Sequence, residues 1–443
     1  MRMFFWLAII IIGLIAPLAG PVFGEETEPE AMKWLAIHGE LKVHFRWSQD
    51  SRFLDLYPFP PDFIPRGQTA VYEQTVDPGS SLEVSSANLI LDLFPESSVT
   101  GRVKINFIDL YNRNPTSTDQ TVNVKEAWLQ FGPRHEFMRA CDGCKIYVLF
   151  GKAPKFERQP DRNLESYGMV STAFNRFEDL QFQAGGDVAQ FYWRAQVSDG
   201  NPVFFRDVNA LAGDNGNDDW RFPNPQLHLN SGFPILYDAE TEEVGFHRIE
   251  GGGGFGFRHQ NDELTRGIDV LGYYYQRNLA DTVDLRGTFY GGDLDLLDGT
   301  GGISLPIHGR SKKEAGANLD VRRDAMHLWV QFVHQDMAGL KRNGFEAEIL
   351  YRFGLPVKYA VDGKQLFTFV QPTFRFSLLD NLFTGPYDFV APSVFWDWKK
   401  YDFGMRLGLW QGIDLTTEYA HHQIQSTPKV HEDEFLTTLR ARF

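Results

Sequence analysis

The sequence predicts an all-β protein, a transmembrane antiparallel β-barrel of about 16 or 18 strands with long external loops. Three features predict it: a strand-like alternation of apolar and charged residues that recurs along the chain, an export leader at its start, and an aromatic residue that ends the last strand. Each feature occurs singly in other proteins, but a transmembrane barrel accounts for all three.

The alternation is clearest in IHGELKVHFRW, residues 37–47. A β-strand directs successive side chains to opposite faces, so the odd positions form an apolar face and the even positions an ionisable face. In a soluble sandwich the apolar face would meet a core. In an outer-membrane barrel it would meet lipid, and the charged face would line a watery lumen. In the barrel, the lipid-facing residues of this strand are Ile37, Leu41, Val43 and Phe45.

The same alternation, in places less regular, predicts further strands. They lie at 86–93, 99–107, 122–131, 145–151, 179–184, 189–197, 253–259, 267–276, 283–290, 315–321, 326–332, 345–353, 366–376, 401–409 and 412–420. With 37–47 and the last strand they make about seventeen candidates, whereas a single-chain bacterial barrel has an even number. Short connections at 94–98 and 410–412 alternate with long polar ones at 48–80, 152–178 and 199–248, so we expect turns on the periplasmic side and loops outside.

The start of the chain is typical of a cleaved signal peptide, because Arg2 precedes a long apolar run that ends in small residues. An uncleaved anchor helix is the alternative, but Pro17 and Pro21 interrupt the run. We expect a signal peptide at 1–24, a short periplasmic segment at 25–33 and the transmembrane barrel at 34–443. This organisation predicts the outer membrane of a Gram-negative cell.

The composition agrees with such a barrel. A mean hydropathy of −0.31 accompanies 38 Phe, 10 Trp and 16 Tyr, which is expected where only every second strand residue contacts lipid. No later stretch holds the roughly 18 consecutive apolar residues of a transmembrane helix. The net charge is −15, or −16 once the leader with its one charged residue, Arg2, is removed, so nucleic acid is not an expected partner.

The two cysteines, Cys141 and Cys144 in RACDGCKIY, predict a small loop disulfide in an oxidising compartment. A redox dithiol and part of a metal site are the alternatives. Lys145 follows the pair where a c-type haem attachment site would have His, and no zinc-ligand pattern lies nearby. We therefore expect neither a metal nor a cofactor.

No catalytic pattern stands out, so the chain is not expected to be an enzyme. Outer-membrane phospholipases and proteases need Ser, His and an orienting Asn or Asp held together, and no local signature joins them here. The glycine run GGGGFGF at 251–257 leads into a strand rather than a helix, which favours close backbone packing over a phosphate loop. GDNGNDD at 213–219 departs from the spacing of a calcium loop and is typical of an external loop.

The last ten residues, EFLTTLRARF, form a strand that ends in an aromatic residue. Such a strand resembles the recognition signal of outer-membrane barrels. We therefore interpret Phe443 as an assembly signal and the barrel-assembly machinery as a partner.

Between residues 122 and 202 the order of features resembles the phosphate-selective porin O and P family and its general-porin relatives. VNVKEAWLQFG is similar to that family's strand before a turn, and YVLFGKAPKFERQPDRNLESYG to its Gly-Lys strand end and long loop; FEDLQFQAGGD and FYWRAQVSDGNP resemble the two strands that follow. The resemblance implies a trimeric, water-filled channel of about 16 strands for passive diffusion of small hydrophilic solutes or ions, with an inward loop that narrows the pore.

The ionisable strand faces supply the candidate pore-lining residues: His38, Glu40, Lys42, His44, Arg46, Arg102, Lys104, Arg194, Glu346, Glu348 and Arg352. The loop at 152–178 supplies the candidate constriction: Lys152, Lys155, Arg158, Arg162 and Arg176. We expect Arg158 and Arg162 to approach the opposite wall and to set ion preference. The alternative is a loop that caps the barrel outside.

The solute is not specified by these residues. The family's phosphate channels carry dense Lys and Arg, whereas acidic and basic residues are mixed here, so anions such as phosphate are one candidate among others. A structural barrel sleeve that holds an electron-transfer cytochrome is the alternative function, and an outer-membrane hydrolase is a less favoured one.

Overall fold

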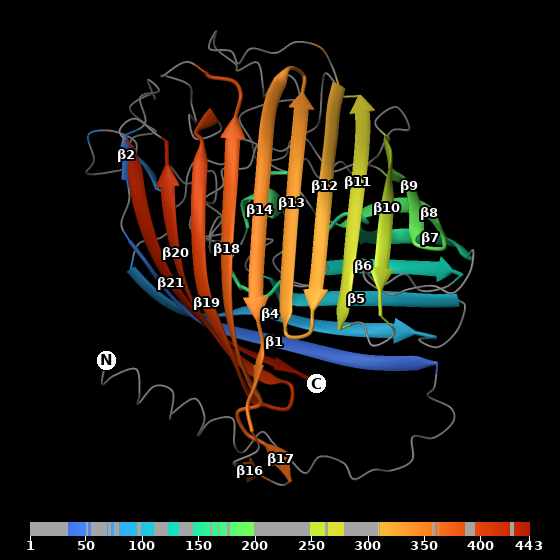
Figure 1. Cartoon of the computed structure of the whole chain (residues 1–443). Helices are drawn as coiled ribbons and strands as arrows, with labels where there is room; N and C mark the ends of the chain where they lie inside the picture. Colours follow the sequence, from blue (N-terminus) through green and yellow to red (C-terminus); the bar gives the residue numbers. More distant parts are fainter. Residues whose placement is uncertain are drawn as a thin grey trace.

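The chain forms a closed ring of antiparallel strands (Figure 1). The computed structural model describes residues 34–49, 52–54, 69, 72–74, 79–94, 99–109, 123–132, 145–159, 162–166, 168–174, 178–198, 249–261, 265–278, 309, 311–356, 359–361, 363–385, 395–425 and 429–443. The expected signal peptide and periplasmic segment lie outside these residues and stay predictions.

Sixteen strands form the wall, because β15 only continues β14 along the same neighbour, β18. The wall strands are β1 (Leu35–Ser48), β4 (Gly79–Leu93), β5 (Val99–Asp109), β6 (Asn123–Phe131), β7 (Lys145–Pro154), β8 (Glu178–Val188), β9 (Phe191–Ser198), β10 (Glu250–Gln260), β11 (Arg266–Asn278), β12 (Ser311–Arg323), β13 (Met326–Met337), β14 (Leu340–Tyr351) with β15 (Phe353–Gly354), β18 (Phe369–Asn381), β19 (Trp398–Trp410), β20 (Ile413–Ile424) and β21 (Val430–Arg442). Two small hairpins, β2–β3 (Arg52–Leu54, Tyr72–Gln74) and β16–β17 (Ala360–Val361, Lys364–Gln365), form separate two-stranded sheets.

Each wall strand pairs with its neighbours in the chain, and β1 closes the ring by pairing with both β4 and β21. The predicted transmembrane-type antiparallel barrel is confirmed, and the number of strands is sixteen. The candidate strand at 283–290 lies outside the described residues. Because β11 pairs directly with β12, the ring closes without a strand between them.

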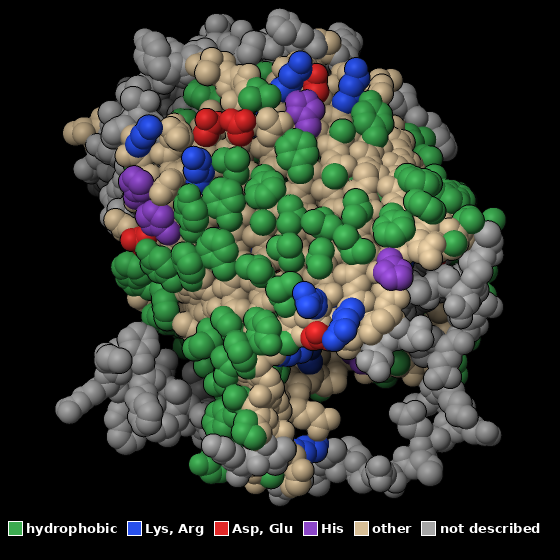
Figure 2. All heavy atoms as spheres, viewed as in Figure 1, with side chains coloured by type: hydrophobic (Ala, Val, Ile, Leu, Met, Phe, Trp, Pro, Cys, Tyr) green, Lys and Arg blue, Asp and Glu red, His purple; other side chains and the backbone are tan. Residues whose placement is uncertain are grey.

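The two faces of the strands differ as the alternation predicts. On β1, Ile37 and Leu41 are 58% and 41% exposed on the outer surface, while His44 and Arg46 are buried on the inner face. Figure 2 shows the outer surface of the same side as Figure 1: apolar side chains form a broad band, and charged side chains gather at its upper and lower edges. This distribution is the one that a lipid-embedded barrel requires.

Several short turns join strands at the end of the barrel where the last strand stops. Ala189 and Gln190 form the turn between β8 and β9, and Ala189 has a left-handed φ of 53°. The strand predicted at 189–197 therefore begins at Phe191, two residues later than predicted, because the two-residue hairpin uses residues 189 and 190 for its turn. The β16–β17 hairpin extends beyond this same end (Figure 1).

The glycine run at 251–257 lies within β10, as close backbone packing predicted. A Cβ at Gly252 would overlap the ring of Tyr275, and a Cβ at Gly256 would overlap the ring of Tyr192. Both rings are buried against the inner wall. The glycines are therefore needed to let large tyrosine side chains lie flat on a neighbouring strand.

The described helix is short. Helix α2 (Met169–Ala173) lies inside the ring and packs against β13, β14 and β18. In the part of the chain that the structure describes, no helix has the length and apolar character needed to cross a bilayer.

The facing of the strands can be tested on two adjacent residues of β5. Lys104 pairs with Glu126 on the inner face, and Val103 pairs with Ala127 on the outer face. In intact membranes a water-soluble maleimide should label Lys104→Cys and leave Val103→Cys unlabelled, because only the first contacts water. The opposite labelling pattern would contradict the facing.

The closing seam can be tested at Gly39. The backbone N–H of Gly39 donates to the carbonyl of Phe443 at 2.7 Å, and a Cβ at Gly39 would overlap the Phe443 ring. We expect Gly39→Val to lower the free energy of unfolding by about 1–3 kcal/mol through overpacking. Urea unfolding measures it, with Gly251→Val as the control, since an added Cβ there meets nothing within 4 Å. Equal effects of the two variants would argue against the seam contact.

Candidate functional site: a charged interior crossed by a loop

The inner face of the barrel is lined by ionisable side chains that are paired with one another. Along β20, Asp414, Glu418 and His422 point inward and are buried, whereas Tyr419 is exposed outside. Burying a charge without a partner is costly, so an interior of this kind has to balance its charges locally.

A loop crosses this interior from the end of β7 to the start of β8. It begins at Lys155, because Lys152 and Pro154 still belong to β7. Lys155 forms an ion pair with Glu250, which Lys312 also contacts at 3.1 Å. The Nζ of Lys155 lies 4.5 Å from the ring centroid of Tyr275.

Glu157 forms hydrogen bonds to two strands of the wall. Its carboxylate accepts a hydrogen bond from the Tyr275 hydroxyl at 2.7 Å, and its carbonyl accepts one from the Asn318 amide at 2.6 Å. Asn318 belongs to β12, so the loop has already passed from its own strand to a wall five strands away.

The middle of the loop binds inward residues of β14 and β18. The amide of Asn163 donates to Glu348 at 2.7 Å and accepts from Gln371 at 3.3 Å. Gln159 also donates to Glu348, at 3.3 Å. One inward glutamate of β14 therefore holds two loop side chains.

Ser166 contacts three charged residues of the wall. Its carbonyl and its hydroxyl each accept a hydrogen bond from the buried guanidinium of Arg375 at 2.8 Å, and its hydroxyl lies 3.1 Å from Asp402. Arg375 and Asp402 also pair directly at 3.0 Å. The backbone N–H groups of Glu165 and Ser166 both donate to the carboxylate of Glu418.

Helix α2 fixes the last part of the loop. The backbone N–H of Val170 faces Glu346 at 3.4 Å, and a Cβ at Gly168 would overlap the same carboxylate, so the chain approaches β14 closely. The guanidinium of Arg342 donates to the carbonyl of Ala173 at 2.7 Å and lies 5.0 Å from the ring centroid of Phe174. The loop is thus attached to the wall along most of its described length.

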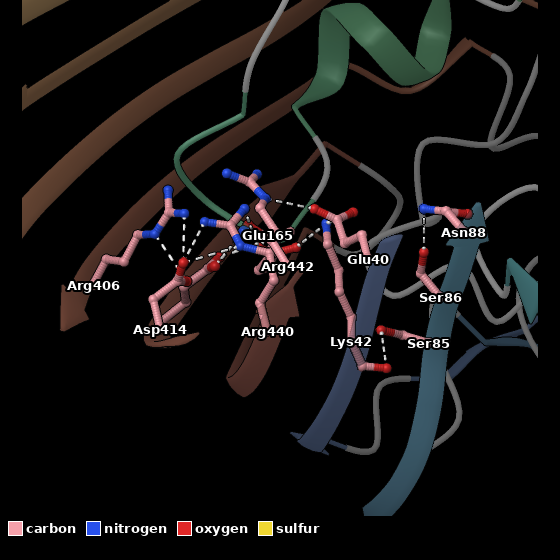
Figure 3. A network of polar contacts seen from close by, with 12 residues as sticks. Glu40, Lys42, Ser85, Ser86, Asn88, Glu165, Arg406, Asp414, Arg440 and Arg442 are labelled. Atoms are coloured by element: carbon pink, nitrogen blue, oxygen red, sulfur yellow. Dashed lines mark hydrogen bonds and ion pairs between the residues drawn. The ribbon is translucent and has the colours of Figure 1, made fainter. Parts of the chain in front are cut away.

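Glu165 enters a basic cluster at the seam (Figure 3). Its carboxylate lies 2.8 Å from Lys42 on β1 and 3.5 Å from Arg440 on β21. Burial raises the pKa of Glu165, but Lys42, Arg162 and Arg406 outweigh this effect and hold it below the ordinary value. The carboxylate is therefore ionised at neutral pH.

The other predicted pore-lining residues lie in several places. Arg102 pairs with Asp92 at 2.7 Å, and His38, which is mostly exposed, lies 3.7 Å from the same carboxylate. Lys104 lies within electrostatic range of Glu126 on the next strand. These residues belong to β1, β4, β5 and β6, a sector of the wall in which Lys42 contacts Glu165 of the loop.

Two predicted arginines lie farther from that sector. Arg194 on β9 pairs with Asp187 at 3.2 Å, and its guanidinium lies 4.6 Å from the ring centroid of Tyr192. Arg352, just after β14, donates to Gln371 at 2.8 Å.

The predicted constriction residues that the structure describes lie in different surroundings. Arg158 pairs with Glu178 at the start of β8, and Arg162 lies within electrostatic range of Lys42. Lys152 pairs in register with Leu180, whose side chain is exposed outside, so Lys152 points outward. Arg176 lies outside the described residues, as do Cys141 and Cys144, and the disulfide stays a prediction.

Sequence reasoning did not select four of the residues that hold the loop: Arg375, Asp402, Glu418 and Arg440. All four lie in or beside predicted strands, and the alternation could have identified their inward direction. It could not have identified their partners. Among the described residues no group of three His, Cys, Asp or Glu side chains is arranged to hold a metal ion.

The chain resembles known proteins in its structure. No protein-family model matches the chain, and no curated protein matches it. The outer membrane channel DcaP of Acinetobacter baumannii aligns with a TM-score of 0.51 at 9% identity, over 92% of this chain and 97% of that one. OprB of Pseudomonas putida aligns with a TM-score of 0.50 at 10% identity, over 93% and 94%.

At these identities the likeness concerns the fold: the chain has the barrel architecture of outer-membrane channels. The likeness therefore agrees with the barrel fold that the sequence resemblance implies. Membership of the phosphate-selective porin O and P family stays a prediction.

The attachment of the loop can be tested at Glu250, the shared counterion of Lys155 and Lys312. Glu250→Gln removes the charge and keeps the shape, which leaves two buried cations without it, so we expect a loss of about 3–5 kcal/mol in the free energy of unfolding. Urea unfolding in detergent measures it. Asp324→Asn is the matched control, because its pair with Arg266 is exposed and should contribute little. Equal midpoints for the two variants would contradict the assignment.

Proposed function

We propose that the protein is an outer-membrane channel for passive diffusion of small hydrophilic solutes or ions. The observation that carries the proposal is the closed ring of sixteen strands whose inner face is ionisable and whose interior is crossed by an attached loop. A barrel of this size encloses an aqueous passage, and flow down a gradient needs no cofactor or turnover.

The attached loop counts against the alternative of a sleeve around a cytochrome. A sleeve needs an open bore, whereas this loop forms hydrogen bonds to β12, β14, β18, β19 and β20 inside the ring. The same contacts support a constriction, because a narrow passage with low-dielectric walls concentrates the field of the few charges beside it.

The proposal includes the route to the membrane. We infer export through a cleaved signal peptide at 1–24, insertion by the barrel-assembly machinery with Phe443 as the signal, and a Gram-negative outer membrane as the location. A homotrimer and anionic solutes such as phosphate stay predictions. Phe443 hydrogen-bonds to Gly39 at the seam, which supports a role for this residue in closing the barrel.

Conductance in planar lipid bilayers tests the channel. Purified, folded protein should give stepwise openings whose current is proportional to voltage, because diffusion through a fixed pore has no catalytic step. A complete lack of steps from folded protein would contradict the proposal.

Ion preference tests the constriction. Replacing Arg158 and Arg162 together by Gln removes two positive charges from the loop, so the reversal potential in a KCl gradient should shift toward cation preference and the single-channel conductance should change. Arg266→Gln is the control, since Arg266 is exposed at the start of β11. If neither quantity differs from this control, the loop arginines do not set the selectivity.

A further inference from the structure

Two cations stand directly opposite each other at the seam that closes the barrel. Lys42 on β1 and Arg440 on β21 are register partners in the antiparallel ladder. Both side chains point inward, and they are 20% and 2% exposed. Like charges in directly opposed positions repel each other, so this pair requires an anion between them.

Glu165 supplies that anion from the loop rather than from the wall (Figure 3). One carboxylate oxygen, Oε2, lies 2.8 Å from Nζ of Lys42, and the other, Oε1, lies 3.5 Å from Nη1 of Arg440. The side chain is 7% exposed. A single carboxylate therefore spans the two cations with its two oxygens.

The surrounding charges do not replace Glu165. Asp414 is already shared by Arg406 and Arg440, at 2.8 Å and 2.9 Å. Glu40 is bound to Arg442 at 2.9 Å and lies 3.7 Å from Lys42. If Glu165 left, the two opposed cations would lose the counterion that spans them both.

We propose that Lys42 and Arg440 form a binding site for a carboxylate group of a permeating solute, and that Glu165 occupies this site as a tethered competitor. The inference rests on the proposed channel function and names the solute class: small organic acids. It follows from the occupant, because the site already accepts a carboxylate in a two-oxygen contact.

Because Glu165 is covalently part of the loop, the concentration of a free acid determines how often the acid replaces it in the site. A covalently attached group acts as a ligand at an effective concentration on the order of millimolar, so a free acid competes with it only at comparable concentration. Displacing Glu165 removes one attachment of the loop while Ser166 keeps its contacts to Arg375 and Asp402. Solute binding thereby changes the charge beside the passage without releasing the whole loop.

Calorimetric titration of malonate into folded, detergent-solubilised protein tests the site directly. Glu165→Gln keeps the shape of the side chain and removes the competing charge, so it should bind malonate about tenfold more tightly than the unmodified protein. Adding Lys42→Gln to this variant should remove the gain. Asp324→Asn, which removes one exposed negative charge elsewhere, should bind as the unmodified protein does. If Glu165→Gln binds no more tightly than Asp324→Asn, the inference is wrong.

Bilayer recordings distinguish a failure of this inference from a failure of the channel proposal. In KCl, Glu165→Gln should shift the reversal potential toward chloride preference, and millimolar malonate should reduce its chloride current more than that of the unmodified channel. If both proteins gave stepwise openings in KCl and malonate reduced their currents equally, the inference would be wrong. The channel proposal would then still hold. If no protein gave steps, the channel proposal would fail, and the calorimetric comparison would still decide the site.

Discussion

Closure of the sheet at β1 and β21 is the constraint on which the rest of the structure depends. A strand in lipid has no water to satisfy its backbone, so each N–H and C=O needs a neighbouring strand, and only a closed ring supplies one everywhere. Here the last strand pairs with the first from Glu40 to Ser48, and Phe443 exchanges two backbone hydrogen bonds with Gly39. Once the ring is closed, the alternation along each strand becomes a difference between outside and inside.

Closure also brings the inward charges of many strands into one interior, and the loop helps to neutralise them. Inward positions on opposite walls face a shared interior, and their charges have to be neutralised there. The loop contributes both its side chains and its backbone: Glu165 lies between Lys42 and Arg440, and the N–H groups of residues 165 and 166 bind Glu418. Because these contacts come from many strands, the loop and the wall stabilise each other.

The same arrangement gives the passage an uneven distribution of charge. The described loop contacts fall mostly on the wall from β10 to β21, whereas Arg102, Lys104 and Glu126 line β5 and β6. Arg158 stands between these regions, paired with Glu178. A solute would therefore meet a few specific side chains rather than the net charge of −15 of the whole chain. This is why the preference of the channel depends on local pairs such as Lys42 and Glu165.

The sequence by itself determined the strands, their facing and most of the wall, because these follow from a period of two residues and from local turn chemistry. It placed Ile37 outside and His44 inside, and it marked β14 by its alternating glutamates. The tertiary structure decided the strand number, the outward position of Lys152, and the wall residues that the loop binds. Glu165 and Glu418 are 253 residues apart, and Lys42 meets Arg440 only at the seam. No local pattern records such contacts, since they arise when the ring closes and brings distant strands around one interior.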